Sequence, residues 1–363
     1  MNLTLIAGAR PNFMKIAPII HAIKSAQQNG KNIHYRLVHT GQHYDQKMSD
    51  TFFTELNIPA PNVNLGCGGG TQAEQTAAIM VAFEKELVAH PADLVMVVGD
   101  VTSTMACSIV AKKLNTKVAH VEAGIRSWDL TMPEEINRMV TDALADYYFT
   151  TTELANQNLR NIGAREEQIY FVGNVMIDTL LKNLPRLSKP HFFDKLNLKE
   201  KEFFVLTLHR PANVDEGEKL KSLMDEIVNN VHGLPVIFPI HPRTAKIFQD
   251  LGIEAENLKI VEPLGYLEFN YLVKHAKAVI TDSGGITEET TVMGVPCITL
   301  RDNTERPETV TVGTNELIGT NPAAIKPALD KLFAGEWKKG GIPELWDGRA
   351  AERIVEKLIE IYG

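Results

Sequence analysis

The stretch around Ser283 has the residue types of an anion-binding turn. The short apolar run at residues 278–280 is typical of a buried strand, and a helix is predicted from Gly284-Gly285 to about Met293. The first N–H groups of a helix carry partial positive charge, and glycine lets a ligand approach the backbone closely. The spacing therefore predicts a phosphate site, and the alternative is a plain strand-to-helix turn capped by Ser283.

Polar and charged side chains also follow the ends of several other apolar runs. Open α/β sheets bind their ligands beyond the carboxyl ends of the strands. In the first half of the chain the residues at such places are Arg10, Lys15, Gln42, His43, Asp100, Glu122 and Glu134. In the second half they are His209, His241, Ser283, Gly284, Gly285, Glu289 and Arg306. If two sheets face each other across a cleft, these two sets meet there.

Each set predicts a different task. His209 and the amides of Gly284-Gly285 are predicted phosphate donors, and Arg10 is favoured as a ligand because it lies in the turn itself. Glu289 lies where a carboxylate can accept ribose hydroxyls, although it also complements the helix dipole.

Three carboxylates, Asp100, Glu122 and Glu134, fall within one half of the chain. Neighbouring carboxylates can raise each other's pKa, so that one is protonated and another ionised near neutrality. Such a pair suits a reaction that removes a proton from one face of a molecule and returns it on another. Each one taken singly also fits an N-cap, a structural hydrogen bond or a surface charge.

The elements that must position these residues alternate between strand and helix. Strands are predicted at residues 3–7, 34–38, 94–98, 118–121, 147–150 and 168–172, and again at 203–208, 236–240, 258–261, 278–281 and 296–300. This α/β pattern predicts two Rossmann-like, doubly wound domains. The first spans residues 1–172, with a terminal helix at 349–363 packing back on it, and the second spans 173–348, entered through a linker-like stretch at 180–201.

Composition limits the class of protein. The 363 residues are 44% hydrophobic and 23% charged, which is ordinary for a globular protein, and the net charge of −8 gives no footprint for nucleic acid. Three widely spaced cysteines predict a reducing, cytoplasmic location without disulfides or a metal pair. No leader peptide and no apolar run near ~18 residues is present, so no membrane association is expected.

Seven motifs recur in a fixed order along the chain. They are Gly8-Ala-Arg-Pro11, Thr40-Gly-Gln-His43, Gly99-Asp-Val-Thr-Ser-Thr104, His120-Val-Glu-Ala-Gly-Ile-Arg126, Pro133-Glu-Glu-Ile-Asn-Arg138, Thr281-Asp-Ser-Gly-Gly-Ile-Thr-Glu-Glu289 and Arg301-Asp-Asn-Thr-Glu-Arg-Pro-Glu308. On the basis of these motifs, the chain closely resembles the non-hydrolysing UDP-N-acetylglucosamine 2-epimerases over nearly its whole length.

The resemblance implies a glycosyltransferase-B-like fold with its active site in the cleft between the domains. It implies reversible conversion of UDP-GlcNAc to UDP-ManNAc for cell-envelope polysaccharide synthesis, by anti elimination of UDP to 2-acetamidoglucal and re-addition. It also implies that catalysis needs no cofactor and no metal, and that the protein is a homodimer formed through its first domain.

The resemblance also implies roles for individual residues. Asp100, Glu122 and Glu134 would be the acid and base groups, and His209 would assist departure of the diphosphate. Arg10, Ser283, Gly284 and Gly285 would hold the phosphates, Glu289 the ribose, Phe269 the uracil region, and Arg138 and Arg306 the sugar. Gln42, His43 and Gln46 match the allosteric UDP-GlcNAc site of bacterial members, in some of which an Arg-Gln pair stands where this chain has Gly69-Gly70.

Other activities stay open at this point. The form Met132-Pro-Glu-Glu-Ile-Asn137 also occurs in related epimerases that act on a UDP-2,3-diacetamido uronic acid. A hydrolysing epimerase that releases free ManNAc, a glycosyltransferase on the same fold and a non-catalytic nucleotide-sugar binder are the remaining alternatives.

Overall fold

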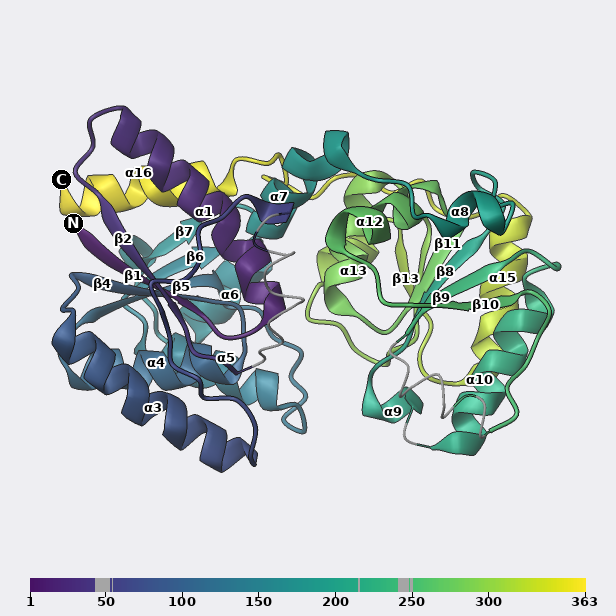
Figure 1. Cartoon of the computed structure of the whole chain (residues 1–363), viewed down its shortest axis with the longest axis horizontal. Helices are drawn as coiled ribbons and strands as arrows, with labels where there is room; N and C mark the ends of the chain where they lie inside the picture. Colours follow the sequence, from purple (N-terminus) through teal and green to yellow (C-terminus); the bar gives the residue numbers. More distant parts are fainter. Residues whose placement is uncertain (43–52, 54, 215, 241–247, 249–250) are drawn as a thin grey trace. The chain divides into compact units, whose positions relative to one another are not determined.

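The structure is a computed structural model that describes residues 1–42, 53, 55–214, 216–240, 248 and 251–363. The chain forms two compact units (Figure 1). The first comprises Met1–Lys182 and Glu344–Gly363, and the second comprises Asn183–Pro343. Among the described residues, no helix combines the length and the apolar composition needed to span a bilayer.

The first unit is built on a parallel seven-stranded sheet with the order β3-β2-β1-β4-β5-β6-β7. Its strands are β1 (Asn2–Ala7), β2 (His34–His39), β3 (Val63–Asn64), β4 (Leu94–Val98), β5 (Lys117–Ala123), β6 (Tyr147–Thr150) and β7 (Ile169–Phe171). β4 is buried along its whole length, as expected for a strand covered on both faces. The strand order reverses between β1 and β4, so a crevice is expected at their carboxyl ends.

Helices cover both faces of this sheet. They are α1 (Arg10–Gln28), α3 (Gln72–Ala89), α4 (Thr102–Lys113), α5 (Pro133–Leu144), α6 (Glu153–Asn161), α7 (Val175–Asn183) and α16 (Ala350–Tyr362). α3 and α4 pack on one face, in a core that includes Phe83 and Val97. The C-terminal helix α16 lies beside α1, and buried Asp178 of α7 accepts hydrogen bonds from the N–H groups of Ala350 and Ala351 (Figure 1).

The second unit repeats the same plan with a parallel six-stranded sheet in the order β10-β9-β8-β11-β12-β13. Its strands are β8 (Phe204–Thr207), β9 (Val236–Pro239), β10 (Leu258–Val261), β11 (Ala278–Thr281), β12 (Cys297–Thr299) and β13 (Asn315–Leu317). Its helices are α8 (Phe192–Lys195), α9 (Pro211–Val214), α10 (Gly217–Asn230), α12 (Tyr266–His275), α13 (Gly284–Met293), α14 (Pro307–Thr311) and α15 (Ile325–Phe333). Here the order reverses between β8 and β11.

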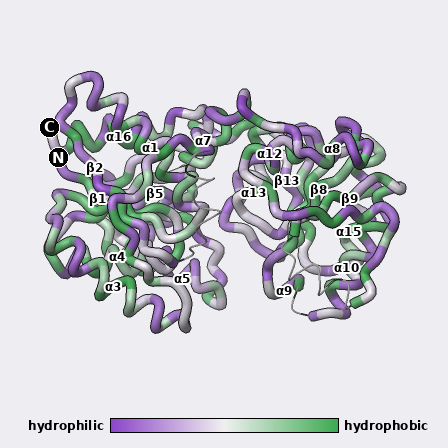
Figure 2. The backbone as a smooth tube through the Cα atoms, viewed as in Figure 1, coloured by the Kyte–Doolittle hydropathy of each residue, from purple (hydrophilic) through white to green (hydrophobic). Residues whose placement is uncertain are grey.

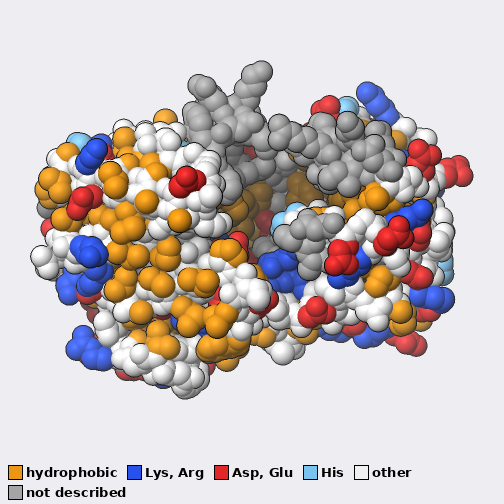
Figure 3. Space-filling model, turned by 90° about the horizontal axis from the view of Figure 1, so that it is seen from below, with side chains coloured by type: hydrophobic (Ala, Val, Ile, Leu, Met, Phe, Trp, Pro, Cys, Tyr) orange, Lys and Arg blue, Asp and Glu red, His pale blue; other side chains and the backbone are white. Residues whose placement is uncertain are grey.

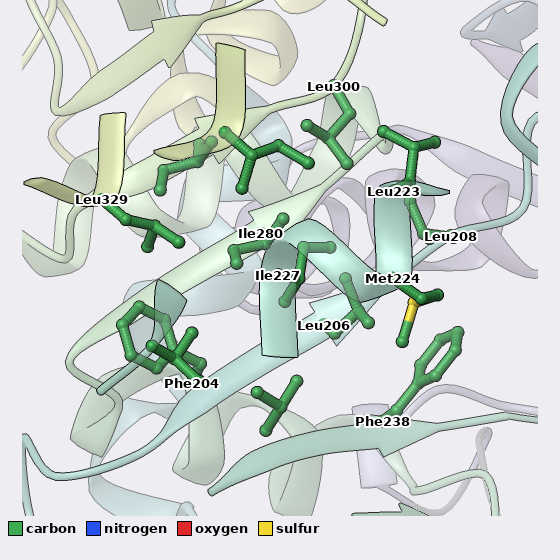
Figure 4. Close-up of a cluster of buried hydrophobic side chains, with 14 of the residues drawn as sticks. Phe204, Leu206, Leu208, Leu223, Met224, Ile227, Phe238, Ile280, Leu300 and Leu329 are labelled. Atoms are coloured by element: carbon green, nitrogen blue, oxygen red, sulfur yellow. The ribbon is translucent and has the colours of Figure 1, made fainter. Parts of the chain in front are cut away.

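The core of the second unit lies between its sheet and the helices α10 and α15. Phe204, Leu206 and Ile280 point from the sheet toward Ile227 of α10 and Leu329 of α15 (Figure 4). In both units the hydrophobic stretches of the chain run along the central strands (Figure 2).

The predicted α/β architecture of two Rossmann-like sheets is confirmed. Short 3₁₀ turns, at Glu166–Gln168, Leu184–Arg186 and Pro322–Ala324, complete the elements. The stretch 180–201, predicted as a linker with the lead-in to a second domain, contributes to a core. Phe192, Phe193 and Leu198 are buried against the sheet of the second unit. The prediction missed this because three apolar residues among lysines and prolines show no period.

Candidate functional site

A first cluster of candidate residues lies where β1 and β4 end in the first unit. Asn12 Oδ1 accepts the backbone N–H groups of Gly8 and Ala9 at 2.9 and 3.0 Å, and Asn12 Nδ2 donates to the Val98 carbonyl at 3.1 Å. One buried side chain thus ties the turn after β1 to the end of β4. The backbone at the ends of these two strands is therefore fixed by one side chain.

Asp100 follows β4 and is held by a buried arginine. Arg138 Nη2 and Nε lie 2.6 and 3.1 Å from Asp100 Oδ2, and Arg138 Nη1 lies 2.6 Å from Glu135 Oε2. Glu135 is fully buried, whereas about a quarter of the Asp100 side chain stays exposed. Arg138 and Glu135 thus hold the Asp100 carboxylate in place while part of it stays accessible. A general acid or base needs both properties.

Glu122 is buried in β5 and paired with a lysine. Its Oε2 lies 2.7 Å from Lys15 Nζ, and only 5% of the residue is exposed. Its φ of 74° is in the left-handed region, at a shift in register between Val121 and Ala123. Non-glycine residues adopt such angles at a cost and cluster at functional sites. The Lys15 ammonium lies over Gly99, since a Cβ built there would be 2.7 Å from Nζ.

The other predicted residues of the first unit have different surroundings. Glu134 lies in the first turn of α5 with its side chain exposed. Gln42 Oε1 accepts the Ser103 hydroxyl at 2.8 Å and its N–H at 3.2 Å. The structure thus joins Asp100 to Arg138 and Glu122 to Lys15. Three predicted residues of the first unit lack a described position or side chain: His43, Gln46 and, for its side chain only, Arg10.

A second cluster of candidate residues lies where β8 and β11 end in the second unit, and buried Asp282 organises it. Its carboxylate accepts the backbone N–H groups of His209 and Arg210 at 3.0 and 2.9 Å, and His209 Nδ1 lies 2.7 Å from Oδ1. Burial alone would raise the pKa of Asp282, but the His209 ring and these N–H groups hold it below its ordinary value. His209 itself is 61% exposed, so its Nε2 edge is open to a ligand.

The turn into α13 is lined by charged side chains. Ser283 occupies the N-cap position without a side-chain cap bond, and its N–H donates to Thr281 Oγ1 at 3.0 Å. A Cβ built on Gly284 would lie 2.4 Å from Glu305 Oε1 and 3.6 Å from Arg301 Nη1. Arg301 Nη2 is bound to Glu305 Oε2 at 2.6 Å. Any larger residue at Gly284 would therefore displace this ion pair.

Glu288 and Glu289 of α13 are both buried but differ in their partners. Glu288 Oε1 lies 2.5 Å from Arg306 Nε. Glu289 accepts a hydrogen bond from Asn270 Nδ2 at 3.4 Å. Burial raises the pKa of the Glu289 carboxyl to about 7, although donors on Tyr266 and Asn270 act in the opposite direction. Glu289 is thus a buried acid that loses its proton near neutrality.

Phe269 is half-buried on α12 and packs against the core beside the sheet. His241 lies outside the described residues. In the described ranges, no three His, Cys, Asp or Glu side chains lie together in a way that could hold a metal ion.

The raised pKa of Glu289 predicts a pH-dependent stability. Between pH 4.5 and about 7 the unfolded chain has lost this proton while the folded protein keeps it, so the free energy of unfolding falls as pH rises. Glu289→Gln removes this loss, and at pH 8 the variant should exceed the wild type by about 3 kcal/mol, with the difference nearly absent at pH 4.5. Urea unfolding at a series of pH values measures it, and a constant difference would contradict the assignment.

Sequence reasoning missed several residues that hold the site together. These are Asn12, Glu135, Asn137, Asp142, Asp282, Asn213, Glu288, Arg301 and Glu305. The motif Pro133-Glu-Glu offered two adjacent acids, and only the helical period shows that Glu135 shares the inward face with Arg138 and Asp142. The residues beside Asp282 in the chain give no indication of its role.

Comparison with known proteins agrees with this geometry. The family model for UDP-N-acetylglucosamine 2-epimerase matches residues 25–359. The UDP-N-acetylglucosamine 2-epimerase of Methanocaldococcus jannaschii is 42% identical over 99% of each chain. The UDP-2,3-diacetamido-2,3-dideoxy-D-glucuronate 2-epimerase of Pseudomonas aeruginosa is 38% identical over 99% of this chain and 100% of its own.

A solved structure is similar as well. The crystal structure of the M. jannaschii UDP-GlcNAc 2-epimerase in complex with UDP-GlcNAc and UDP superimposes with a TM-score of 0.89 and covers 100% of both chains. Sequence and fold thus agree over the full length. The two Rossmann-like domains, of the glycosyltransferase-B-like kind, are those of the UDP-N-acetylglucosamine 2-epimerase family, to which this chain belongs.

Proposed function

We propose that the protein interconverts UDP-GlcNAc and UDP-ManNAc. The observation that carries this proposal is the 42% identity, over 99% of both chains, to a relative that is named for acting on UDP-N-acetylglucosamine. The site supports it, because a helix N-terminus with an ordered histidine suits a diphosphate, and fixed carboxylates suit proton transfer.

The proposed reaction proceeds by elimination and re-addition. A carboxylate removes the proton from C2, the C1–O bond breaks, and UDP leaves with the bonding electrons, giving 2-acetamidoglucal. UDP then adds back to C1 while a proton returns to the opposite face of C2. Because the C2 proton is weakly acidic, stabilising the departing UDP supplies much of the rate enhancement.

The second unit is proposed to hold the UDP. The diphosphate would accept hydrogen bonds from the amides of Ser283, Gly284 and Gly285, where the partial charge of α13 is positive. His209, with Nδ1 fixed by Asp282, would present Nε2 to the leaving oxygen. The ribose would lie on Glu289 and the uracil near Phe269, and His241 and Arg10 are proposed as further ligands.

The first unit is proposed to supply the proton transfers. Asp100 and Glu122 are each fixed by a cation, and Glu134 lies exposed one helical turn from Arg138. Lys15 and Arg138 thereby set the electrostatic field at the sugar, together with Arg306. The reaction requires both units to act on one substrate molecule, so closure on UDP is expected.

Proton NMR of the sugar tests this proposal. In D₂O, the protein incubated with UDP-GlcNAc should form UDP-ManNAc, and both product and recovered substrate should carry deuterium at C2. A product that retains only protium at C2 would exclude the elimination mechanism. Release of free ManNAc and UDP would instead identify a hydrolysing epimerase.

A second substrate is favoured by the P. aeruginosa relative, which is 38% identical over the whole chain and named for a UDP-2,3-diacetamido glucuronate. That sugar differs by a carboxylate at C6 and a second acetamido group at C3. Parallel assays with both nucleotide sugars decide between them. A higher kcat/KM for the uronate would show that it, and not UDP-GlcNAc, is the preferred substrate.

Paired glycine variants test the proposed diphosphate site. Gly284→Ala should weaken UDP binding at least tenfold, since its Cβ would displace Glu305 from Arg301. Gly285→Ala meets no atom within 4 Å in the free protein, so it should fold normally, and its loss of affinity would report the approach of the ligand. Calorimetry measures both; unchanged affinity in both variants would place the diphosphate elsewhere.

We also propose that the protein is a homodimer formed through its first unit. Eight of the eleven large hydrophobic residues that are exposed among the described residues belong to this unit. They include Val81 and Val88 on α3 and Ile136 and Met139 on α5. Hydrophobic side chains gather on the face of the first unit that Figure 3 shows. An exposed apolar surface of this kind marks an interface.

Light scattering tests the dimer. The wild type should have twice the chain mass of 40.3 kDa, and Ile136→Glu should shift it toward the monomer. Val312→Glu, on a similarly exposed residue of the second unit, is the matched control and should leave the mass unchanged. A monomeric wild type at micromolar concentration would contradict the proposal.

Gln42, together with His43 and Gln46, remains proposed as an allosteric site for a second UDP-GlcNAc. The hydrogen bonds of Gln42 to Ser103 connect it to α4, which follows Asp100. A sigmoidal dependence of rate on UDP-GlcNAc supports this proposal, and hyperbolic kinetics would contradict it.

A further inference from the structure

The backbone that carries Asp100 is fixed by side chains at three consecutive carbonyls. The Val98 carbonyl accepts Asn12 Nδ2 and Thr104 Oγ1, at 3.1 and 3.0 Å. The Gly99 carbonyl accepts from the His120 ring at 2.8 Å, and the Asp100 carbonyl accepts Asn137 Nδ2 at 2.9 Å. Of these donors only His120 is an ionisable group, and it is fully buried.

Both ring nitrogens of His120 face oxygen atoms. Nε2 lies 2.8 Å from the Gly99 carbonyl, which can only accept, so Nε2 carries a proton. Nδ1 lies 2.7 Å from Asp142 Oδ1, and this short contact also needs a proton between the two atoms. The ring and the carboxyl group therefore share one proton in addition to that on Nε2.

The surroundings of Asp142 decide where the shared proton resides. Asp142 Oδ2 accepts Arg126 Nη1 at 2.6 Å and the Gly124 N–H at 3.0 Å, and the residue is fully buried. Burial alone would raise the pKa of Asp142, but its contacts with His120 and Arg126 hold it below its usual range. A carboxylate bound in this way stays ionised, which leaves the proton on the imidazole.

We propose that His120 is a buried imidazolium that acts as a positioning residue for Asp100, by donating a charge-assisted hydrogen bond to the Gly99 carbonyl. The carboxylate of Asp142 keeps it charged, and Arg126 keeps that carboxylate ionised. A charge-assisted bond is about twice as strong as a neutral one, so it restrains the peptide between Gly99 and Asp100 more tightly. The positioning role rests on the proposed function, whereas the protonation state does not.

The Asp142→Asn variant separates charge from geometry. The introduced amide can accept Arg126 Nη1 and the Gly124 N–H through its oxygen, while its NH₂ group donates to Nδ1 of a neutral His120. Nε2–H then still donates to Gly99, so every partner is satisfied and the fold should persist. The hydrogen bond to Gly99 loses its charge assistance, and Arg126 exchanges its carboxylate partner for an amide oxygen.

Nitrogen NMR of ¹⁵N-histidine-labelled protein tests the protonation state without any assay of activity. His120 should show two protonated ring nitrogens in the wild type at pH 7.5, and one protonated and one bare nitrogen in Asp142→Asn. The signals are assigned by their loss in His120→Leu or, if that variant does not fold, by their change in Asp142→Asn. A bare ring nitrogen in the wild type would overturn the proposal.

Steady-state kinetics tests the positioning role. Asp142→Asn should lower kcat about tenfold and His120→Leu about a hundredfold, while UDP affinity stays within about twofold, because UDP is held by the second unit. Asp146→Asn is the matched control: like Asp142, its carboxylate binds two basic side chains, here lysines, and a backbone N–H, but at the other end of the sheet. It should leave kcat unchanged.

The outcomes distinguish the two proposals. If the NMR shows the imidazolium but the wild type does not turn over UDP-GlcNAc, the proposed function fails and the charged histidine stands. If the wild type is active and Asp142→Asn has full kcat, or if Asp146→Asn loses as much, the positioning role is overturned.

Discussion

Replacing Asp100 by Asn is expected to lower kcat by about 10²–10⁴-fold, the usual contribution of a general acid or base. The change removes the charge and the proton-transfer capacity of the carboxylate while keeping an oxygen that Arg138 can bind. Arg138 also retains Glu135, so the guanidinium is not left without a partner. The loss should therefore appear in kcat, with UDP affinity within about twofold of the wild type, measured by steady-state rates and by calorimetry.

The matched control for this variant is Asp225→Asn, which makes the same change at an exposed residue of α10. It should leave both kcat and the melting temperature unchanged. Glu134→Gln should be measured alongside Asp100→Asn. It removes the charge of an exposed carboxylate, whereas the Asp100 carboxylate is held by Arg138. Full activity in Asp100→Asn would show that Asp100 takes no part in proton transfer and serves only to order Arg138.

The sheets could be predicted because their strands are continuous apolar runs with turn residues after them. β4 matches its predicted bounds, and α13 begins at Gly284 as expected, since both follow from local pattern alone. The anchors of the site could not be predicted in this way. The buried face of α5 is polar, formed by Glu135, Asn137, Arg138, Thr141 and Asp142, and so no hydrophobic period indicates which side faces inward.

In the second unit, too, the residue that anchors the candidate site could not be predicted from the sequence, but for a different reason. Asp282 is fully buried, and its partners are backbone N–H groups of residues more than seventy positions away in the chain. Backbone groups carry no sequence signal, so the pairing depends on the order of strands β8 and β11. The sequence indicates His209 and Gly284 as candidate ligands because they follow the strands, but it does not indicate the carboxylate of Asp282, which binds the His209 ring.

Removing the Lys15 charge is expected to give the largest loss of stability. Lys15 and Glu122 form an ion pair at 2.7 Å, and each side chain is nearly nine-tenths or more buried. Breaking such a pair from one side leaves a buried charge without its counter-ion and destabilises by about 3–5 kcal/mol. Lys15→Met keeps the length of the side chain, so urea unfolding of this variant measures the electrostatic loss with little change in packing.

The double variant Lys15→Met/Glu122→Gln isolates the cause. With both charges removed the penalty of the uncompensated carboxylate disappears, and the double variant should regain most of the stability that Lys15→Met loses. Lys24→Met, on the exposed face of the same helix, should be within about 0.5 kcal/mol of the wild type. If Lys15→Met is as stable as Lys24→Met, the pair contributes nothing to the fold, and the left-handed backbone of Glu122 must be held by its other contacts.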